Sequence, residues 1–383
     1  MATPERDVFG WDIGGAHVKA CRFQRSEVVD VAQWACPLWQ GMDQLAAVLE
    51  KAHARWPGLG AAQHAVTMTG EMVDLFANRE DGVRRIAAEL TQHLLPGTSS
   101  SGAVHFYAGD AGWCSSAEVA THWEAIASAN WLATARHAAL CIEKNDRNHD
   151  HNDGILVDIG STTTDLIAFK DGRVLTTSRT DAQRLASGEL VYHGVVRTPL
   201  CALAQRIDWR GTPHNVMNEF FAATADVYRL TGELNTAHDL HPSADNAPKD
   251  TLATCQRLAR MVGLDQRDAA ASDWLDFARS WRAAQVAELG GQLRRVMAAH
   301  GLSRNAVVVS AGCGDFLVAD VLTQARIGGG GGGDGSGGEV FAYGRDIARV
   351  SAHARPDRRI NQAWAQVCAP SVAVAALFDQ DHR

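Results

Sequence analysis

The sequence predicts an α/β protein of two lobes, because the chain contains the same strand–turn–strand pattern twice. The first copy reads Asp-Ile-Gly-Gly at residues 12–15, and the second reads Asp-Ile-Gly at residues 158–160. In each copy an apolar run ends at the aspartate and a glycine turn, and a second run of β-forming residues follows. The 383 residues are enough for two separate cores. We therefore expect an N-terminal lobe over 1–150 and a C-terminal lobe over 151–383.

The N-terminal lobe is expected to combine a strand meander with helices. Alternation of apolar and polar residues predicts strands at 8–12, 17–24, 28–35, 65–69 and 104–108. Helical periodicity predicts helices at 42–56, 79–95 and 116–139. Pro57-Gly58 is expected to end the first of these helices.

The C-terminal lobe is expected to contain its own meander, followed by helices. Strands are predicted at 155–159, 164–169, 174–178, 306–310 and 339–343. Helices are predicted at 251–263, 268–300, 315–326, 345–353 and 358–378. Trp274, Phe277 and Trp281 recur on one stripe of the long helix, which indicates a core-facing surface. Gly328–Gly338 is expected to be a flexible loop, either a natural insertion or an engineered replacement.

The two turns have the chemistry of a phosphate site with a divalent cation. Asp12 and Asp158 end equivalent strands and are the candidate Mg²⁺ ligands. Asp165 is either a third acid or a structural cap. Glycine N–H groups and small hydroxyls favour phosphate oxygens. The expected phosphate-binding residues are Gly14, Gly15, His17, Gly160, Ser161, Thr162 and Thr163. Neither turn opens a helix or contains the P-loop pattern, which excludes both common phosphate loops.

Further candidates lie close to these turns in the sequence. Lys19 shares a strand face with His17, and it either neutralises charge on a departing diphosphate or is simply solvated. Glu71 follows Thr-Gly and is a candidate carboxylate ligand or general base. Gly312 and Gly314 end an apolar strand before a helix, which lets a flat group approach the backbone.

Composition narrows the class of protein. Net charge is −8 without a basic block, which argues against nucleic acid as a partner. The chain has no run of about 18 apolar residues and no signal-peptide core at its start, so we expect a cytoplasmic protein without a membrane span. The eight cysteines are scattered, which argues against zinc sites and a disulfide framework.

The three glycine motifs together resemble the phosphate-1, phosphate-2 and adenosine segments of the actin–sugar kinase–Hsp70 superfamily. Other segments narrow the resemblance to its hydantoinase/oxoprolinase-related branch, at residues 69–72, 129–131, 187–199 and 225–234. Within that branch the chain is similar to proteins of tetrahydromethanopterin-linked one-carbon transfer. The resemblance covers about residues 7–325.

This resemblance implies a two-lobed, ribonuclease H-like fold with a cleft between lobes. It also implies a Mg²⁺-dependent transferase of methanofuran-type cofactor biosynthesis. Such an enzyme joins an aminomethylfuranylmethyl diphosphate to the phenol of a tyramine or tyrosine derivative and releases diphosphate. Tyr192 and Arg197 are then expected on the acceptor side. The alternatives are an ATP-dependent kinase or hydrolase, or a non-catalytic nucleotide-binding scaffold. In both alternatives Gly312 and Gly314 contact the nucleotide.

Overall fold

A computed structural model describes residues 7–95, 102–145, 153–327 and 338–383, and these form two compact units. Unit 1 contains the described residues before Asp153, Phe169–Asp181 and Phe341–Arg383. Unit 2 contains the described residues of Asp153–Ala168 and Ala182–Val340. Unit 1 thus takes in two segments, 169–181 and 341–383, that follow the boundary expected near residue 150. The expected flexible loop at 328–338 lies outside the described residues, apart from Gly338.

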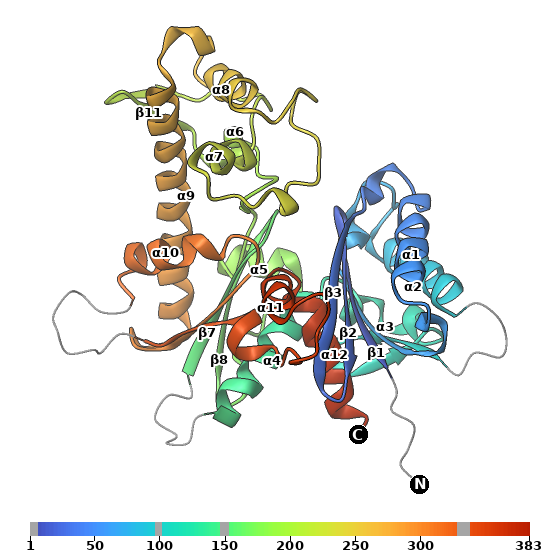
Figure 1. Ribbon diagram of the computed structural model, residues 1–383. Helices are drawn as coiled ribbons and strands as arrows, with labels where there is room; N and C mark the ends of the chain where they lie inside the picture. The colour runs from blue at the N-terminus through green and yellow to red at the C-terminus, as the bar shows by residue number, and fades with distance from the viewer. Residues whose placement is uncertain (1–6, 96–101, 146–152, 328–337) are drawn as a thin grey trace. The chain divides into compact units, whose positions relative to one another are not determined.

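Unit 1 is built on a six-stranded sheet in the order β3-β2-β1-β4-β5-β6. Figure 1 labels β1, β2 and β3 of this sheet. β1 pairs antiparallel with β2 and parallel with β4, so the first turn lies at the carboxyl end of β1. The core of the unit includes Trp11 and Ile13, which are fully buried. The strands are β1 Val8–Ile13, β2 His17–Gln24, β3 Glu27–Ala35, β4 Gln63–Met68, β5 Ala103–Tyr107 and β6 Trp113–Ser115.

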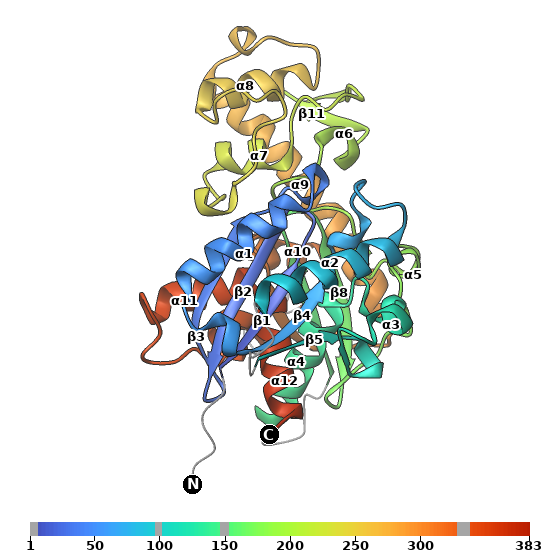
Figure 2. The same cartoon turned by 90° about the vertical axis from the view of Figure 1, so that its right-hand side faces the viewer.

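Helices cover this sheet on both faces. Figure 2 shows α1 and α2 in front of the strands. α12 packs directly against β1, β2 and β4, and α4 packs against α12. This packing explains why the end of the chain belongs to unit 1. The helices are α1 Asp43–Arg55, α2 Arg79–Leu94, α3 Val119–Ile126, α4 Asn130–Asn145, α11 Arg358–Val367 and α12 Ala369–Asp381.

The sheet of unit 2 repeats the arrangement around β1. Its order is β10-β8-β7-β13-β14, with β9 paired to β8. β7 is parallel to β13, as β1 is to β4, and the turn after β7 leads into β8. A separate hairpin joins β11 Arg206–Trp209 to β12 Thr212–Asn215. The sheet strands are β7 Asp153–Ile159, β8 Thr164–Lys170, β9 Arg173–Val174, β10 Leu190–Val191, β13 Val307–Ala311 and β14 Val340–Ala342, of which β9 and the last residues of β8 and β14 are counted in unit 1.

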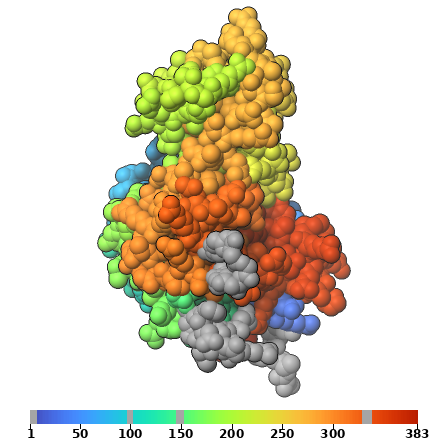
Figure 3. Space-filling view, turned by 90° about the vertical axis from the view of Figure 1, so that its left-hand side faces the viewer, coloured from blue at the N-terminus to red at the C-terminus, as the bar shows by residue number. Residues whose placement is uncertain are grey.

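The longest helix of unit 2 is α9, Ala271–Ala299. Its aromatic stripe is buried, and Trp274 stacks on Trp209 with ring centroids 4.6 Å apart, so the stripe is core as expected. Figure 3 shows α9 and α10 together on one face. No helix in the described part of the chain is long and apolar enough to cross a membrane. The other helices are α5 Asp181–Ser187, α6 Leu200–Leu203, α7 Thr224–Thr231, α8 Thr251–Arg260 and α10 Val318–Ala325.

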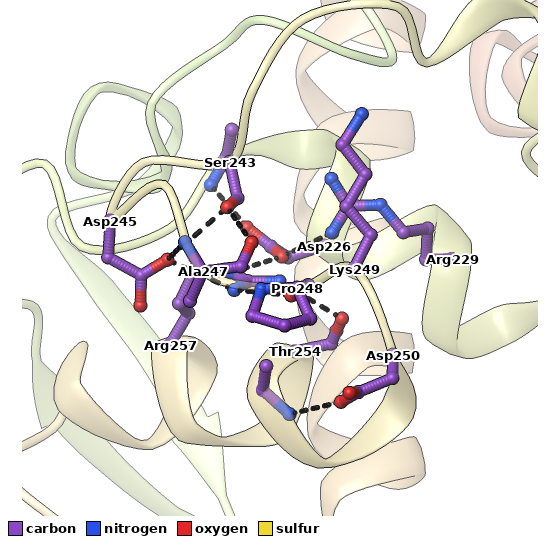
Figure 4. Close-up of polar contacts among 12 residues, drawn as sticks. Asp226, Arg229, Ser243, Asp245, Ala247, Pro248, Lys249, Asp250, Thr254 and Arg257 are labelled. Carbon is purple, nitrogen blue, oxygen red and sulfur yellow. Dashed lines mark hydrogen bonds and ion pairs between the residues drawn. The ribbon is translucent and has the colours of Figure 1, made fainter.

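A buried charge network holds the loop at 235–250 against α7 and α8 (Figure 4). The side chain of Arg257 is fully buried, and its Nε donates to Asp226 Oδ1 at 2.8 Å. Arg229 joins Asp226 to Asp239, and Lys249 also donates to Asp239 at 2.9 Å. The segment 225–234, singled out by the family resemblance, therefore contributes a structural anchor.

Four predicted elements differ from the structure. The helix expected at 116–139 is two helices, separated where Ser128 adopts a left-handed φ of 51°. The helix expected at 345–353 is wrong, because Tyr343–Ile347 forms one π-helical turn and an irregular segment follows. The helix expected at 358–378 divides at Cys368, where φ is −104° and ψ is 28°. The strand expected at 174–178 is limited to the two residues of β9.

Candidate functional site

The two aspartate–glycine turns have the same internal hydrogen bonding. In unit 1 the Gly14 N–H donates to the His17 carbonyl at 2.9 Å, and in unit 2 the Gly160 N–H donates to the Thr163 carbonyl at 2.8 Å. In each unit a neighbouring loop also donates a hydrogen bond to the carbonyl of the isoleucine in the turn. The Thr69 N–H donates to the Ile13 carbonyl at 2.9 Å in unit 1, and the Gly314 N–H donates to the Ile159 carbonyl at 2.8 Å in unit 2. The repeat seen in the sequence is thus a repeat of structure.

Asp12 lies at the end of β1 between residues of both neighbouring strands. Its side chain is 4% exposed, and Lys19 Nζ lies 3.7 Å from its Oδ2. Asp12 has two register partners. Lys19 lies directly opposite it on β2, and Thr67 lies opposite it on β4. The Thr67 hydroxyl is buried without a hydrogen-bond partner in the described structure. Lys19 is thus a half-buried cation beside the candidate metal ligand rather than a fully solvated one.

The first turn is packed tightly against the loop that contains Glu71. Leu38 N–H donates to the Gly15 carbonyl at 3.1 Å, which fixes the outer side of the turn. Gly70 contacts the backbone of the turn so closely that a Cβ there would lie 3.2 Å from the Gly14 carbonyl carbon. His17 is buried at the start of β2. Gly14, Gly15 and His17 therefore form one rigid element with the loop at 69–73.

Glu71 is enclosed in a polar cluster. Its side chain is 0% exposed, its Oε1 accepts from Ser128 Oγ at 2.7 Å, and Arg79 lies 3.2 Å away. The other oxygen, Oε2, is buried and has no hydrogen-bond partner among the residues that the structure describes. Burial raises the pKa of the Glu71 carboxyl, although hydrogen bonds from Ser128 and the charge of Arg79 act in the opposite direction.

In unit 2 the second turn lies against the glycine motif that follows β13. Asp158 is the register partner of Ala311. Gly312 has φ +87°, and any side chain there would clash with the Ile159 carbonyl and the Asp158 carboxylate. Gly314 is close to Ile159 and Val195. The predicted phosphate-2 and adenosine segments are therefore adjacent in space, although they are far apart in sequence.

The segment 194–197 covers the other side of this turn. The N–H groups of Val195 and Val196 donate to the Gly160 and Ser161 carbonyls, each at 3.0 Å. Gly194 contacts the Ser161–Thr162 peptide, where a Cβ would clash with backbone atoms. Its carbonyl accepts from Thr224 Oγ1 at 2.9 Å and Gln285 Nε2 at 3.1 Å. Ser161, Thr162 and Thr163 stay partly exposed on a turn held from two sides.

The remaining predicted residues of unit 2 have separate environments. Asp165 forms a buried ion pair with Arg184 of α5, which gives it a structural partner. Tyr192 is 63% exposed. Arg197 is partly buried, and this burial lowers the pKa of its guanidinium while the nearby Tyr192 acts in the opposite direction. Tyr192 and Arg197 are thus close enough to interact electrostatically.

Several residues beside the turns belong to no sequence motif that would mark them as part of a functional site. Ser128 and Asp181 complete the Glu71 cluster from distant segments, and Gln285 supports Gly194 from α9. Ser128 could have been suspected from its position alone, because it immediately precedes the segment 129–131 that carries the family resemblance.

The donor set of each turn fits a phosphate-bound Mg²⁺ ion. Magnesium in proteins is usually held by one or two carboxylates together with phosphate oxygens and water. Asp12 and Asp158 each place one carboxylate beside a glycine turn. Among the described residues, no group of three or more His, Cys, Asp or Glu is placed to hold a metal by itself. A cation here would depend on the phosphate ligand.

Comparison with known proteins identifies the protein family to which this chain belongs. The sequence profile described as Hydantoinase/oxoprolinase matches residues 63–351, which is more than half of the chain. A solved structure of acetone carboxylase in its nucleotide-free form superposes with a TM-score of 0.51 at 12% identity, covering 83% of this chain and 67% of that one. This likeness shows that the two proteins share an α/β fold. The chain belongs to the hydantoinase/oxoprolinase family, an enzyme family.

Two curated relatives carry the same name, (4-{4-[2-(gamma-L-glutamylamino)ethyl]phenoxymethyl}furan-2-yl)methanamine synthase. The protein from Methanocaldococcus jannaschii is 28% identical over 320 residues, which is 84% of this chain and 90% of that one. The protein from Methanococcus vannielii is 29% identical over 170 residues, which is 44% of this chain and 75% of that one. This chain is therefore similar to the archaeal synthase along most of its length.

Proposed function

We propose that this protein is a synthase of methanofuran-type cofactor biosynthesis in tetrahydromethanopterin-linked one-carbon metabolism. It joins an aminomethylfuranylmethyl diphosphate to the phenol of a tyramine or tyrosine derivative. The main support is the similarity to the archaeal synthase over 84% of the chain. The two matching aspartate–glycine turns agree with this proposal, because the reaction has a diphosphate to bind.

The reaction forms one bond and breaks another at the same carbon. The bond between the furanylmethyl carbon and the diphosphate oxygen breaks, and both its electrons leave with diphosphate. The phenol oxygen forms a new bond to that carbon and loses its proton to a base. The furan ring stabilises positive charge on the carbon, so the main task of the protein is to stabilise the departing diphosphate.

The residues of the turns are suited to this task. In unit 2, backbone N–H groups and the hydroxyls of Ser161, Thr162 and Thr163 are suited to contact phosphate oxygens, and in unit 1 Lys19 adds positive charge beside its own turn. Asp12 or Asp158, each at its own turn, would hold Mg²⁺, which when bound neutralises charge on a leaving diphosphate. Tyr192 and Arg197 orient the phenolic acceptor.

The decisive experiment supplies the diphosphate and the phenol with Mg²⁺ and no ATP. We expect the ether and inorganic diphosphate in equal amounts by mass spectrometry and a diphosphate assay, and loss of both after chelation with EDTA. Tyramine, its γ-glutamyl derivative and tyrosine compared side by side identify the acceptor. Absence of ether with every acceptor would refute the proposal.

A second candidate function is an ATP-dependent kinase or hydrolase. The close contact between Gly312 and Asp158 favours it, because this contact joins the adenosine-type motif to the phosphate turn. The same assay with ATP in place of the diphosphate tests this candidate. Formation of ADP that depends on an added acceptor would favour it, whereas nucleotide binding without turnover would favour a scaffold.

A further inference from the structure

A serine hydroxyl lies between two carboxyl groups in unit 1. Ser128 Oγ is 2.7 Å from Glu71 Oε1 and 2.9 Å from Asp181 Oδ2. Arg79 approaches the same group, with its guanidinium 3.0 Å from the hydroxyl and 3.7 Å from Asp181 Oδ2. Glu71 and Arg79 are eight residues apart, whereas Ser128 and Asp181 come from segments far from them in the sequence. We call Glu71, Ser128 and Asp181 the relay.

Counting protons shows that the relay carries an extra one. A serine hydroxyl has a single proton and can donate to only one acceptor. Both carboxyl groups are nevertheless within hydrogen-bond distance of Ser128 Oγ. A protonated carboxyl that donates to the serine oxygen makes the second contact attractive, while Arg79, 3.2 Å from Glu71 Oε1, offsets the remaining negative charge.

The environment indicates which carboxyl holds the proton. The Glu71 side chain is 0% exposed and its Oε2 has no hydrogen-bond partner in the described part of the chain, whereas the Asp181 side chain is 16% exposed. An ionised carboxylate is much more costly to bury with an unsatisfied oxygen than a neutral carboxyl is. Burial also raises the pKa of Glu71. A proton on Glu71 would reverse its hydrogen bond with Ser128, so that Glu71 donates to Ser128 and Ser128 donates to Asp181.

The backbone at Ser128 agrees with a dedicated role for this hydroxyl. Ser128 has φ 51°, a left-handed conformation that is uncommon for residues other than glycine, asparagine and aspartate. Such conformations persist only where surrounding contacts hold them, and they are frequent at functional sites. Glu71 in turn follows Gly70, which packs on the first phosphate turn. The relay is thus built into the wall of that turn.

We propose that the relay is the proton acceptor of the ether-forming step, with Glu71 permanently protonated, Ser128 orienting, and Asp181 taking the phenolic proton. This inference rests on the proposed function. As the phenol oxygen bonds to the furanylmethyl carbon and the diphosphate leaves, the phenolic proton moves to the Asp181 carboxylate. Arg79, the charged group of α2 that reaches the relay, balances the carboxylate before the transfer.

The first test needs no turnover. Infrared or carbon NMR spectra of wild-type protein with ¹³C-labelled glutamate should contain one protonated carboxyl signal at pH 7, and that signal should be absent from Glu71→Gln. A spectrum at pH 7 in which every glutamate is ionised would overturn the relay. This result is independent of whether ether is formed, so it separates failure of the relay from failure of the proposed function.

The second test compares variants in the ether assay. Glu71→Gln should stay within about tenfold of wild type, because the amide N–H donates to Ser128 as the protonated carboxyl does. Asp181→Asn should lose roughly 10²-fold or more in kcat and lose the acidic limb of the pH profile. Ser128→Gly, which removes the hydroxyl but keeps the left-handed backbone, should lose at least about tenfold.

The control for these variants is Ser115→Ala, which removes a comparable Ser–Glu hydrogen bond of 2.7 Å at an exposed position. It should leave kcat and the pH profile unchanged. If Glu71→Gln is as inactive as Asp181→Asn, Glu71 itself is the base and the proposed direction of transfer is wrong. If folded Asp181→Asn has wild-type activity, the relay takes no part in the reaction.

Discussion

Substitution of Gly194 by alanine should displace the second phosphate turn without changing any charged or polar side chain. The Cβ that this substitution adds would clash with the carbonyl carbon of Ser161 and the nitrogen of Thr162. Both are backbone atoms, so no flexible side chain can move aside. Ordinary contact between carbon atoms is about 3.5–4.0 Å, so the turn must shift on the order of 1 Å.

The magnitude follows from two general effects. Adding a methyl group to a tightly packed region typically costs about 1–3 kcal/mol of unfolding free energy. A misplacement of about 1 Å at a reacting centre lowers the rate by roughly 10²-fold. We therefore expect Gly194→Ala to fold with slightly lower stability and to lose most of its turnover.

The assay combines urea unfolding with ether formation at saturating diphosphate substrate. Gly291→Ala is a matched control in the same unit, because Gly291 lies inside α9 and a Cβ there would meet no atom closer than 4.0 Å. That variant should gain about 0.5–1 kcal/mol of unfolding free energy and keep its activity. Wild-type turnover in folded Gly194→Ala would refute a functional role for the turn at residues 160–163.

Three further predictions address single side chains. Asp158→Asn should lower turnover by at least ~10²-fold with little change in melting temperature, and wild-type turnover would remove Asp158 from the mechanism. Lys19→Met should slow single-turnover chemistry on the diphosphate substrate without weakening acceptor binding, and unchanged rates would contradict its proposed role. His64 accepts from Trp11 and contacts the Leu59 carbonyl, and burial lowers its pKa to about 3. Since unfolding restores a pKa near 6.5, the unfolding free energy should fall by up to about 1.4 kcal/mol per unit as pH drops from 6.5 toward 3. Urea titrations should give a smaller pH slope for His64→Gln, and an unchanged slope would refute this assignment.

Patterns of neighbouring residues were enough to predict the strands and helices that depend on local periodicity. The predicted helices at 42–56 and 79–95 match α1 and α2 to within about one residue. The predicted helices were wrong where contacts between distant segments interrupt a helix. Ser128 interrupts a helical pattern because its hydroxyl contacts Glu71 and Asp181, and no local rule encodes that.

The sequence by itself determined the repeated aspartate–glycine turns, because each turn depends on a strand, a carboxylate and glycines that are consecutive in the chain. It also determined the family, through motifs of several adjacent residues. Only the tertiary structure decided which residues meet those turns. Gly312 against Asp158, Gly194 against Ser161, and the Glu71 relay all join segments far apart in sequence. Their contacts follow from strand order and helix packing, which local propensities do not specify.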